Sequence, residues 1–219
     1  FPDHVGVWWL NLTSVSGAMA ELQITVGYGA IDYLELNTSS TSITADDRVY
    51  INTTRVDVRG NRLAVVLPAD NWTKTSDGPL TPGAPAIWDP VKTGSKILEA
   101  RYETTLTQIT IDVVKGEIQT LRLEVDDVIS TWAHFDLTAD ETLEADVFAI
   151  DAKGNQWAIV VNWTLDHPGM GDSSSFLEVL NGDSTTFTPY FASDEPYMLT
   201  ATYDAGTTVH AVSINMTVD

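Results

Sequence analysis

The sequence contains one phrase twice: VDVRGNRLAVV at Val56–Val66 and IDAKGNQWAIV at Ile150–Val160. In each copy, apolar residues alternate up to an Asp and resume after a Gly-Asn pair. Asp favours the start of a tight turn, Gly readily takes a positive φ, and Asn tolerates left-handed backbone. Each copy therefore predicts two strands joined by a tight turn.

The repetition extends well beyond these two turns. Residues 44–67 align with residues 138–161 without a gap, and an Asn-Trp-Thr triplet follows each block, at residues 71–73 and 162–164. A strand-like segment ending in tyrosine then recurs, ILEARY at residues 97–102 and MLTATY at residues 198–203. Self-similarity over this length indicates two copies of one structural unit.

Short alternating segments fill most of the chain, such as ELQITV at Glu21–Val26 and TQITIDV at Thr107–Val113. A period of two with many Val, Ile and Thr residues is typical of strands that bury one face. We therefore expect an all-β chain with tandem Ig-like β-sandwiches at residues 31–114 and 118–219, preceded by an N-terminal β-hairpin within residues 1–30.

The second unit resembles the prokaryotic Ig-like repeats of the "Big" type, which bacterial and archaeal cell-surface proteins carry in series. The residues that carry the resemblance are Asp151–Asn155, Trp163-Thr164, Thr186–Pro189 and Leu199–Tyr203. It covers nearly all of residues 118–219 and residues 31–114 more loosely, where a Pro/Gly-rich stretch at Ser76–Gly94 replaces the Phe-Thr-Pro strand. The resemblance implies extracellular scaffolding or adhesion.

A third fragment of the pattern stands at the N-terminus. LQITVGYGAIDYLEL at Leu22–Leu36 matches ITIDVVKGEIQTLRL at Ile109–Leu123, which spans the end of one unit and the start of the next. Residues 1–30 therefore resemble the final hairpin of a preceding repeat. We expect this hairpin to take part in assembly through five apolar residues, namely Val5, Val7, Trp9, Leu22 and Ile24.

An isolated hairpin cannot bury its apolar face, which leaves three alternatives. The chain is part of a longer array, and its start at Phe1 without a Met fits processing or cutting from a longer protein. Alternatively, the hairpin folds back and widens the sheet of the first unit. In the third alternative it completes a sheet in another copy, which would give a head-to-tail, open assembly.

The composition restricts the partners. Against 31 acidic residues stand only 11 basic ones, so the net charge is −20 and nucleic acid or an anionic membrane surface would be repelled. There is no cysteine, which excludes disulfides and thiolate metal sites. No apolar run approaches the roughly 18 residues of a membrane span.

The asparagines indicate an extracellular, cell-surface location. Six of the nine lie in Asn-x-Ser/Thr triplets, whereas chance predicts about two in a chain with this Ser and Thr content. We therefore expect N-linked glycans on this chain. The candidate acceptors are Asn11, Asn37, Asn52, Asn71, Asn162 and Asn215.

Catalysis has little support in the sequence. The four histidines show no paired spacing, and HPGMGDSSS at residues 167–175 lacks the Gly-x-Ser-x-Gly elbow of a nucleophilic serine. We expect no enzyme and no catalytic residue. The histidines are His4, His134, His167 and His210.

The sequence leaves the metal content unknown. Acidic residues recur at equivalent repeat positions, and Ca²⁺ binds several hard oxygens gathered at one place, but no Asp-x-Asp-x-Asp-Gly loop is present. No other cofactor is indicated. The positions compatible with Ca²⁺ are Asp46, Asp47, Asp126, Asp127, Asp140 and Glu141.

These observations predict a non-catalytic extracellular structural protein. Our first interpretation is the glycosylated repeating subunit of a pilus-like surface filament, assembled through its N-terminal strands. The alternative is a segment of a long Ig-repeat adhesin or cell-envelope protein, such as an S-layer protein or stalk. A carbohydrate-binding module, with Trp88 and Trp132 as the candidate contact residues, is a third class.

Overall fold

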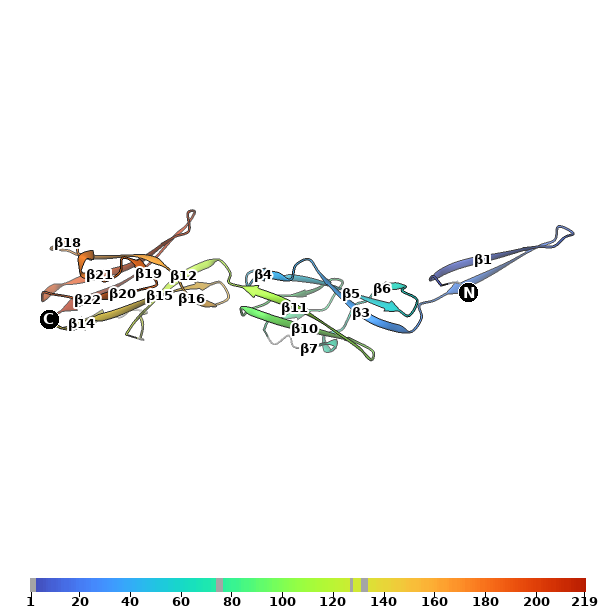
Figure 1. Ribbon diagram of the computed structural model, residues 1–219, viewed down its shortest axis with the longest axis horizontal. Coiled ribbons are helices and arrows are strands. Elements are labelled where there is room, and N and C mark those ends of the chain that lie inside the picture. The colour runs from blue at the N-terminus through green and yellow to red at the C-terminus, as the bar shows by residue number, and fades with distance from the viewer. Residues whose placement is uncertain (1–2, 74–76, 127, 131–133) are drawn as a thin grey trace. The chain divides into compact units, whose positions relative to one another are not determined.

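The computed structural model describes residues 3–73, 77–126, 128–130 and 134–219. The chain divides into two compact units, Phe1–Val114 and Lys115–Asp219, which Figure 1 shows with their strands. No helix in the described part of the chain has the length and apolar character that a membrane span requires.

The first unit contains a sandwich of two sheets. Strand β5 (Val49–Asp57) is central in one sheet, and β10 (Gly94–Tyr102) and β11 (Thr105–Val114) form the middle of the other. The remaining strands are β3 (Ile31–Thr38), β6 (Arg62–Ala64), β8 (Leu80–Thr81) and β9 (Ala86–Trp88) in the first sheet, and β4 (Ser42–Thr44) and β7 (Trp72–Thr73) in the second. A 3-10 turn, η1 (Ala69–Asn71), leads into β7.

The second unit repeats this arrangement. One sheet has β15 (Leu143–Asp151) at its centre, and the other is built on β21 (Ser193–Asp204) and β22 (Val209–Val218). The first sheet also contains β12 (Ile118–Val125), β13 (Val128–Ser130), β16 (Gln156–Ala158) and β20 (Ser184–Phe187), and the second contains β14 (His134–Leu137), β17 (Val161–His167), β18 (Gly171–Asp172) and β19 (Asn181–Gly182). A 3-10 turn, η2 (Ser174–Phe176), follows β18.

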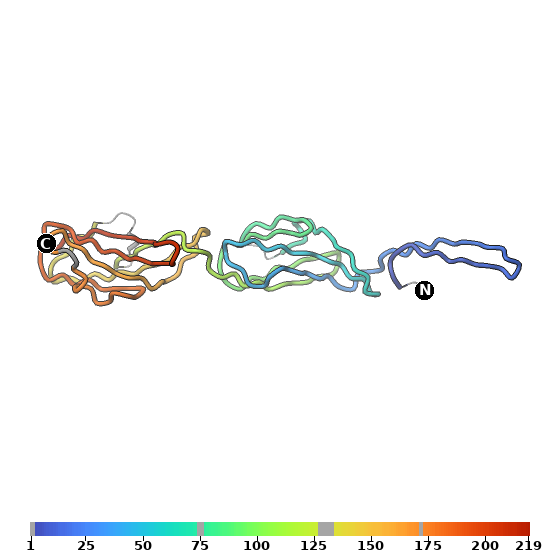
Figure 2. The backbone as a smooth tube through the Cα atoms, turned by 90° about the horizontal axis from the view of Figure 1, so that it is seen from above, coloured from blue at the N-terminus to red at the C-terminus, as the bar shows by residue number. Residues whose placement is uncertain are grey.

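Strand pairing follows the same scheme in both units. The first long strand, β3 or β12, pairs antiparallel with β5 or β15, and the short strand that comes later in the chain, β4 or β14, runs parallel to the last strand. In each unit the chain thus begins in one sheet and then crosses to the other, which is typical of Ig-like sandwiches. The prediction of an all-β fold with Ig-like sandwiches and an added N-terminal hairpin is confirmed; Figure 2 traces its path.

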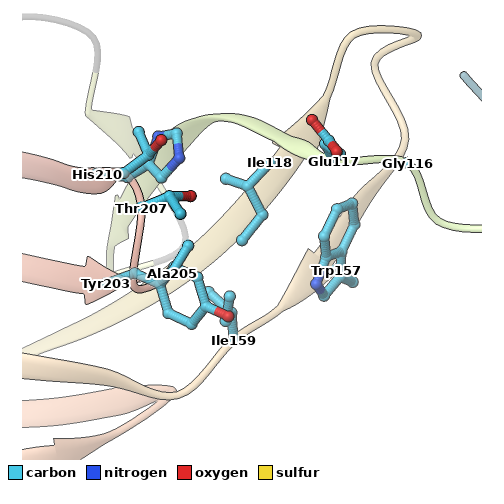
Figure 3. A pocket seen from close by; sticks show the side chains of 10 residues that line it. Gly116, Glu117, Ile118, Trp157, Ile159, Tyr203, Ala205, Thr207 and His210 are labelled. Carbon is cyan, nitrogen blue, oxygen red and sulfur yellow. The ribbon is translucent and has the colours of Figure 1, made fainter.

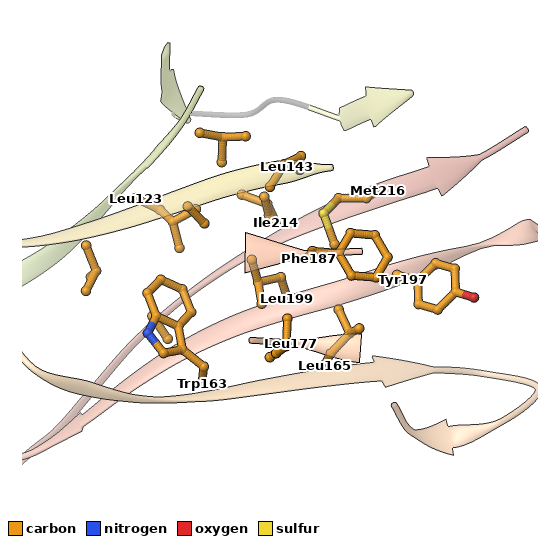
Figure 4. Packing of buried hydrophobic residues seen from close by; sticks show 14 of the residues in the cluster. Leu123, Leu143, Trp163, Leu165, Leu177, Phe187, Tyr197, Leu199, Ile214 and Met216 are labelled. Carbon is orange, nitrogen blue, oxygen red and sulfur yellow. The ribbon is translucent and has the colours of Figure 1, made fainter. Parts of the chain in front are cut away.

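The cores form because alternate strand residues point between the sheets. In the second unit Trp163 is 2% exposed, and its indole N–H donates to the Gly182 carbonyl at 3.0 Å. In the same core the rings of Phe187 and Tyr197 pack against each other with centroids 5.3 Å apart. Figure 4 shows these two rings side by side and Trp163 in another part of the cluster. A buried ring with a satisfied N–H both fills and orients such a core.

The first core uses a different aromatic residue at one matched position. Trp88 is opposite Val49, whereas Phe187 is opposite Leu143, and Val49 and Leu143 are equivalent in the repeat. The Pro/Gly-rich stretch therefore does contain a strand equivalent to the Phe-Thr-Pro strand. Trp88 is 1% exposed, so it is a core residue and not a carbohydrate contact. Trp132, the other candidate, lies outside the described residues.

Replacing Trp163 with alanine should lower the free energy of unfolding of the second sandwich by about 3–5 kcal/mol, because it leaves a cavity in a closely packed core. The matched variant Trp72→Ala removes the corresponding ring of the first sandwich. In calorimetry of the full chain, each variant should shift a different thermal transition. A shift of the same transition by both variants would contradict two separate cores.

Candidate functional site

The turn after β5 is organised by one carboxylate. Asp57 Oδ1 accepts the backbone N–H groups of Arg59 and Asn61, both at 2.9 Å, and Oδ2 accepts the backbone N–H of Gly29 at 2.9 Å. Gly60 has a φ of +79°, which suits glycine. Because Gly29 belongs to the linker before β3, this carboxylate attaches the linker to the end of the sandwich.

The turn after β15 has the same bonds. Asp151 Oδ1 accepts the N–H groups of Lys153 at 3.0 Å and Asn155 at 2.8 Å, and Oδ2 accepts the N–H of Gly116 at 3.1 Å. Gly116 lies in the linker before β12, so the second sandwich holds its incoming linker in the same way. We call residues 57–61 and 151–155 the linker turns.

Both carboxylates are stabilised in the ionised form. The Asn61 side chain, and then the Gly29 N–H, hold the pKa of Asp57 well below its usual range. Burial would raise the pKa of Asp151, but the Asn155 side chain and the surrounding backbone N–H groups outweigh it and lower the pKa. Hydrogen bonds to the charged form have this effect because protonation would break them.

The first linker turn also binds the chain just before the hairpin. Asn61 Nδ2 donates to the Asp3 carbonyl at 3.1 Å, and the Val5 N–H donates to Asn61 Oδ1 at 3.3 Å. Arg59 is 3.3 Å from the Asp3 carboxylate, although this pair is exposed and contributes little. Since Gly29 follows the hairpin, one turn holds both of the hairpin's ends.

The N-terminal hairpin consists of β1 (Gly6–Thr13) and β2 (Met19–Val26), and within the described sheets each pairs only with the other. Trp8 is opposite Ile24 and Leu10 is opposite Leu22. Opposed residues of an antiparallel pair point to the same side. We call the side formed by these residues the inner face; it consists of Trp8, Leu10, Leu12, Leu22 and Ile24.

This register changes the predicted assembly set. Val7 and Trp9 lie opposite Thr25 and Gln23, so they are on the other side of the hairpin from Leu22 and Ile24. Val5 precedes β1, and its backbone N–H bonds Asn61. The five predicted residues therefore do not form one surface. Both sides of β1 carry apolar residues, so the sequence alone does not show which side shares a face with Leu22 and Ile24. The pairing with β2 decides this.

The inner face is open to solvent in this chain. Leu10 is 47% exposed, Leu12 is 58% exposed and Leu22 is 53% exposed. Burial of each such side chain is worth roughly 1.5–3 kcal/mol. Clustered apolar surface of this kind is typical of a binding surface.

The candidate glycan acceptors are accessible. Five of the six are exposed, and Asn71 is half-buried, with its amide N–H donating to the Arg101 carbonyl at 2.7 Å. Asn37 and Asn52 are directly opposite each other on β3 and β5. Glycosylation itself stays a prediction. The exposed acceptors are Asn11, Asn37, Asn52, Asn162 and Asn215.

The acidic repeat positions stabilise local turns. Asp47 Oδ2 accepts the Thr44 hydroxyl at 2.8 Å, Asp140 Oδ1 accepts the Thr138 hydroxyl at 2.6 Å, and Glu141 accepts the Thr138 N–H at 2.8 Å. These contacts satisfy backbone and hydroxyl groups at the entry to a strand. They give these carboxylates a structural role in the turns.

The remaining candidate cation ligands are not brought together. Asp126 Oδ1 accepts the Glu144 N–H at 3.1 Å, and Asp127 lies outside the described residues. Among the residues that the structure describes, no three His, Cys, Asp or Glu side chains are grouped to hold a metal ion. Ca²⁺ binding stays a prediction from the sequence alone.

His167 lies beside a serine hydroxyl, a contact that resembles a catalytic pair. Its Nε2 is 2.7 Å from Ser193 Oγ, but its Nδ1 accepts the Gly169 N–H at 3.1 Å. Nε2 therefore carries the hydrogen in the neutral ring and donates it to Ser193. An imidazole in this tautomer cannot take the proton from Ser193 as a general base would, so the contact is structural.

A pocket of about 460 Å³ lies in the second unit beside its linker. Ile118, Trp157, Ile159 and Tyr203 provide apolar surface, and His210, the cross-strand partner of Tyr203, lies on the opposite side of the pocket from Trp157, as Figure 3 shows. Lys115 Nζ is 5.0 Å from the centre of the Trp157 ring, a cation–π distance. The pocket is thus a partly apolar recess at the linker end of the sandwich.

Comparison with solved structures supports the Ig-like architecture. Invasin, a bacterial integrin-binding protein, matches 94% of this chain with a TM-score of 0.50 and 15% identity. The Escherichia coli adhesin FdeC matches 95% with a TM-score of 0.43 and 15% identity, and surface layer protein SbsC matches 98% with a TM-score of 0.33 and 18% identity. At 15% identity the likeness to invasin concerns the fold alone.

The chain spans 44% of the invasin chain, 74% of the FdeC chain and 35% of the SbsC chain. No protein-family description matches the sequence, and no curated protein matches it.

Acid should weaken the linker turns. A carboxyl whose pKa is lowered by folding stabilises the fold at pH values above its unfolded pKa, about 3.9, and that contribution is lost as the pH falls through the folded pKa. Asp57→Asn should therefore lower the midpoint of thermal unfolding by a few degrees at pH 7, and the difference from the wild type should shrink below about pH 4.

The matched control is Asp32→Asn, at an exposed position on β3, which should leave the midpoint unchanged at every pH. A difference between wild type and Asp57→Asn that stays constant from pH 7 to pH 2 would show that the Asp57 charge is not what stabilises the turn.

Proposed function

We propose that this chain is a non-catalytic structural part of an extracellular cell-surface protein, in which Ig-like sandwiches follow one another as spacers. The observation that carries this proposal is the recurrence of the linker turn. In both units an Asp at the end of the second long strand binds the backbone of the incoming linker. A spacer needs this anchoring, because a linker fixed to its sandwich limits free swivelling.

The strand pairing is also suited to a spacer under tension. In the first unit β4 is parallel to the end of β11, with Ser42 opposite Asp112 and Thr44 opposite Val114. When the two ends of a sandwich are pulled apart, parallel strands at its leading and trailing edges are loaded in shear. The hydrogen bonds between the two strands then resist the pulling force together. If the force acted along the hydrogen bonds, they would break one at a time.

Three observations support an extracellular location. Five candidate glycan acceptors are exposed, the net charge of −20 keeps such a chain soluble, and the fold is similar to part of invasin, a bacterial integrin-binding protein. The adhesin FdeC and the surface layer protein SbsC are further structural matches. The proposed role requires neither a cofactor nor a catalytic residue.

A second candidate function is that of a filament subunit. The exposed inner face of the hairpin favours it, because a neighbouring copy that covered this face would join copies head to tail. In that case successive sandwiches along the fibre would belong to separate copies of this chain, and not to one long polypeptide.

Electron microscopy of material released from the source cells separates these functions. If the sandwiches are spacers in one polypeptide, the images should show thin molecules that all have the same length. If the chain is a filament subunit, they should show open-ended fibres with a regular rise per subunit. Protease treatment of intact cells should release peptides of residues 1–219, and deglycosylation should lower their mass. Peptides released only after cell lysis would contradict the surface location.

A further inference from the structure

We propose that the inner face of the N-terminal hairpin is covered by the first strands of another sandwich of the same type, placed before it in the same polypeptide. This inference rests on the proposed spacer function and names the partner of its unpaired surface. The hairpin would then be the last two strands of that preceding sandwich.

The backbone pairing of the hairpin is the same as that of β10 and β11. Val26 corresponds to Val113 in the repeat, and their cross-strand partners are Gly6 and Gly94. Both glycines have positive φ, +151° and +111°. Strands β1 and β2 therefore match β10 and β11 in pairing and in where the pairing starts.

The inner-face side chains correspond to core residues of the first sandwich. Leu10 of the inner face corresponds to Leu98, which is 0% exposed in the core of the first sandwich. Ile24 corresponds to Ile111, which is also 0% exposed. Leu10 and Leu12, which are exposed in the hairpin, thus occupy the positions of Leu98 and Ala100, which a complete sandwich buries.

The opposite side of the hairpin behaves as an outer face. Trp9 corresponds to Ile97, which is 39% exposed although its sandwich is complete. An apolar residue at this position therefore does not require a cover. Only the inner face lacks the sheet that covers it in the first unit.

The described chain offers no vacant place for this hairpin in a second copy. The first sandwich already contains β10 and β11, and the second contains β21 and β22, so each has its own final hairpin. Addition of β1 or β2 to a sheet edge would pair backbone groups but leave the inner face uncovered. A preceding set of strands in the same polypeptide solves both problems.

The first linker turn is consistent with this position. It binds the Asp3 carbonyl, the Val5 N–H and the Gly29 N–H, so it holds the chain on both sides of the hairpin. A sandwich that ended in β1 and β2 would thereby be fixed to the sandwich of residues 31–114 through both of its last strands.

The test supplies the missing strands from this chain. Because Gly6 corresponds to Gly94, residues 29–93 are placed directly before residues 6–219. Amide exchange of residues 6–26 should then slow by at least about 100-fold relative to the chain of residues 1–219, because opening would require unfolding of a sandwich. A further cooperative transition should appear in calorimetry.

Three inner-face residues differ from those that residues 29–93 normally meet: Trp8 stands for Lys96, Leu12 for Ala100 and Leu22 for Ile109. A second version of the fusion therefore carries Trp8→Lys, Leu12→Ala and Leu22→Ile, which restores the original packing partners. If exchange of residues 6–26 stays fast in both versions, the proposal is wrong.

Matched variants test the face itself. In the fusion, Leu10→Ser should abolish the slow exchange, because it places a polar group in the new core, and Trp9→Ser on the outer face should leave it slow. Equal effects of the two variants would contradict the assignment of the faces.

Sedimentation of the unfused chain separates this inference from the proposed function. We expect a monomer with fast exchange in residues 6–26. Dimers or fibres in which these amides are protected, and which Leu10→Ser dissociates, would show that a second copy covers the face. That result would overturn this inference and favour the filament, whereas absence from the cell surface would overturn the proposed function alone.

Discussion

An aspartate carboxylate at the end of the second long strand fixes the chain in each unit. Its two oxygens accept backbone N–H groups from the turn that follows and from the linker that precedes the sandwich. A serine or an amide at this position offers fewer acceptors and no charge, so it could not satisfy both segments equally well. Strand end, turn and linker therefore depend on one side chain, Asp57 or Asp151.

Around this fixed point the two cores use different residues. Trp88 in the first unit fills the position of Phe187 in the second, although both are opposite equivalent residues on the central strand. Backbone pairing and the linker turn are thus repeated more faithfully than the packing. This is expected when patterning sets the fold and volumes are adjusted locally.

Much of the fold follows from the sequence, because the Asp-Gly-Asn turns and the period of two specify strands and their connections. The strand at Ala86–Trp88 has only a weak sequence signal, since prolines and glycines surround it. The sequence could not separate the two sides of the hairpin, because Trp8 and Trp9 are both apolar and only the pairing of β1 with β2 decides which one faces inward. The role of Val5, Val7, Trp9, Leu22 and Ile24 in assembly stays a prediction. The bond from Gly29 to Asp57 carries no local sequence signal, as the two residues belong to different segments.

The most direct test of this account is amide exchange at the linker glycines. Wild-type protein should protect the amides of Gly29 and Gly116, because each donates to a carboxylate. Asp57→Ala should make the Gly29 amide exchange at least about tenfold faster, while Gly116 keeps its protection. Unchanged exchange at Gly29 in this variant would contradict the claim that the carboxylate anchors the linker.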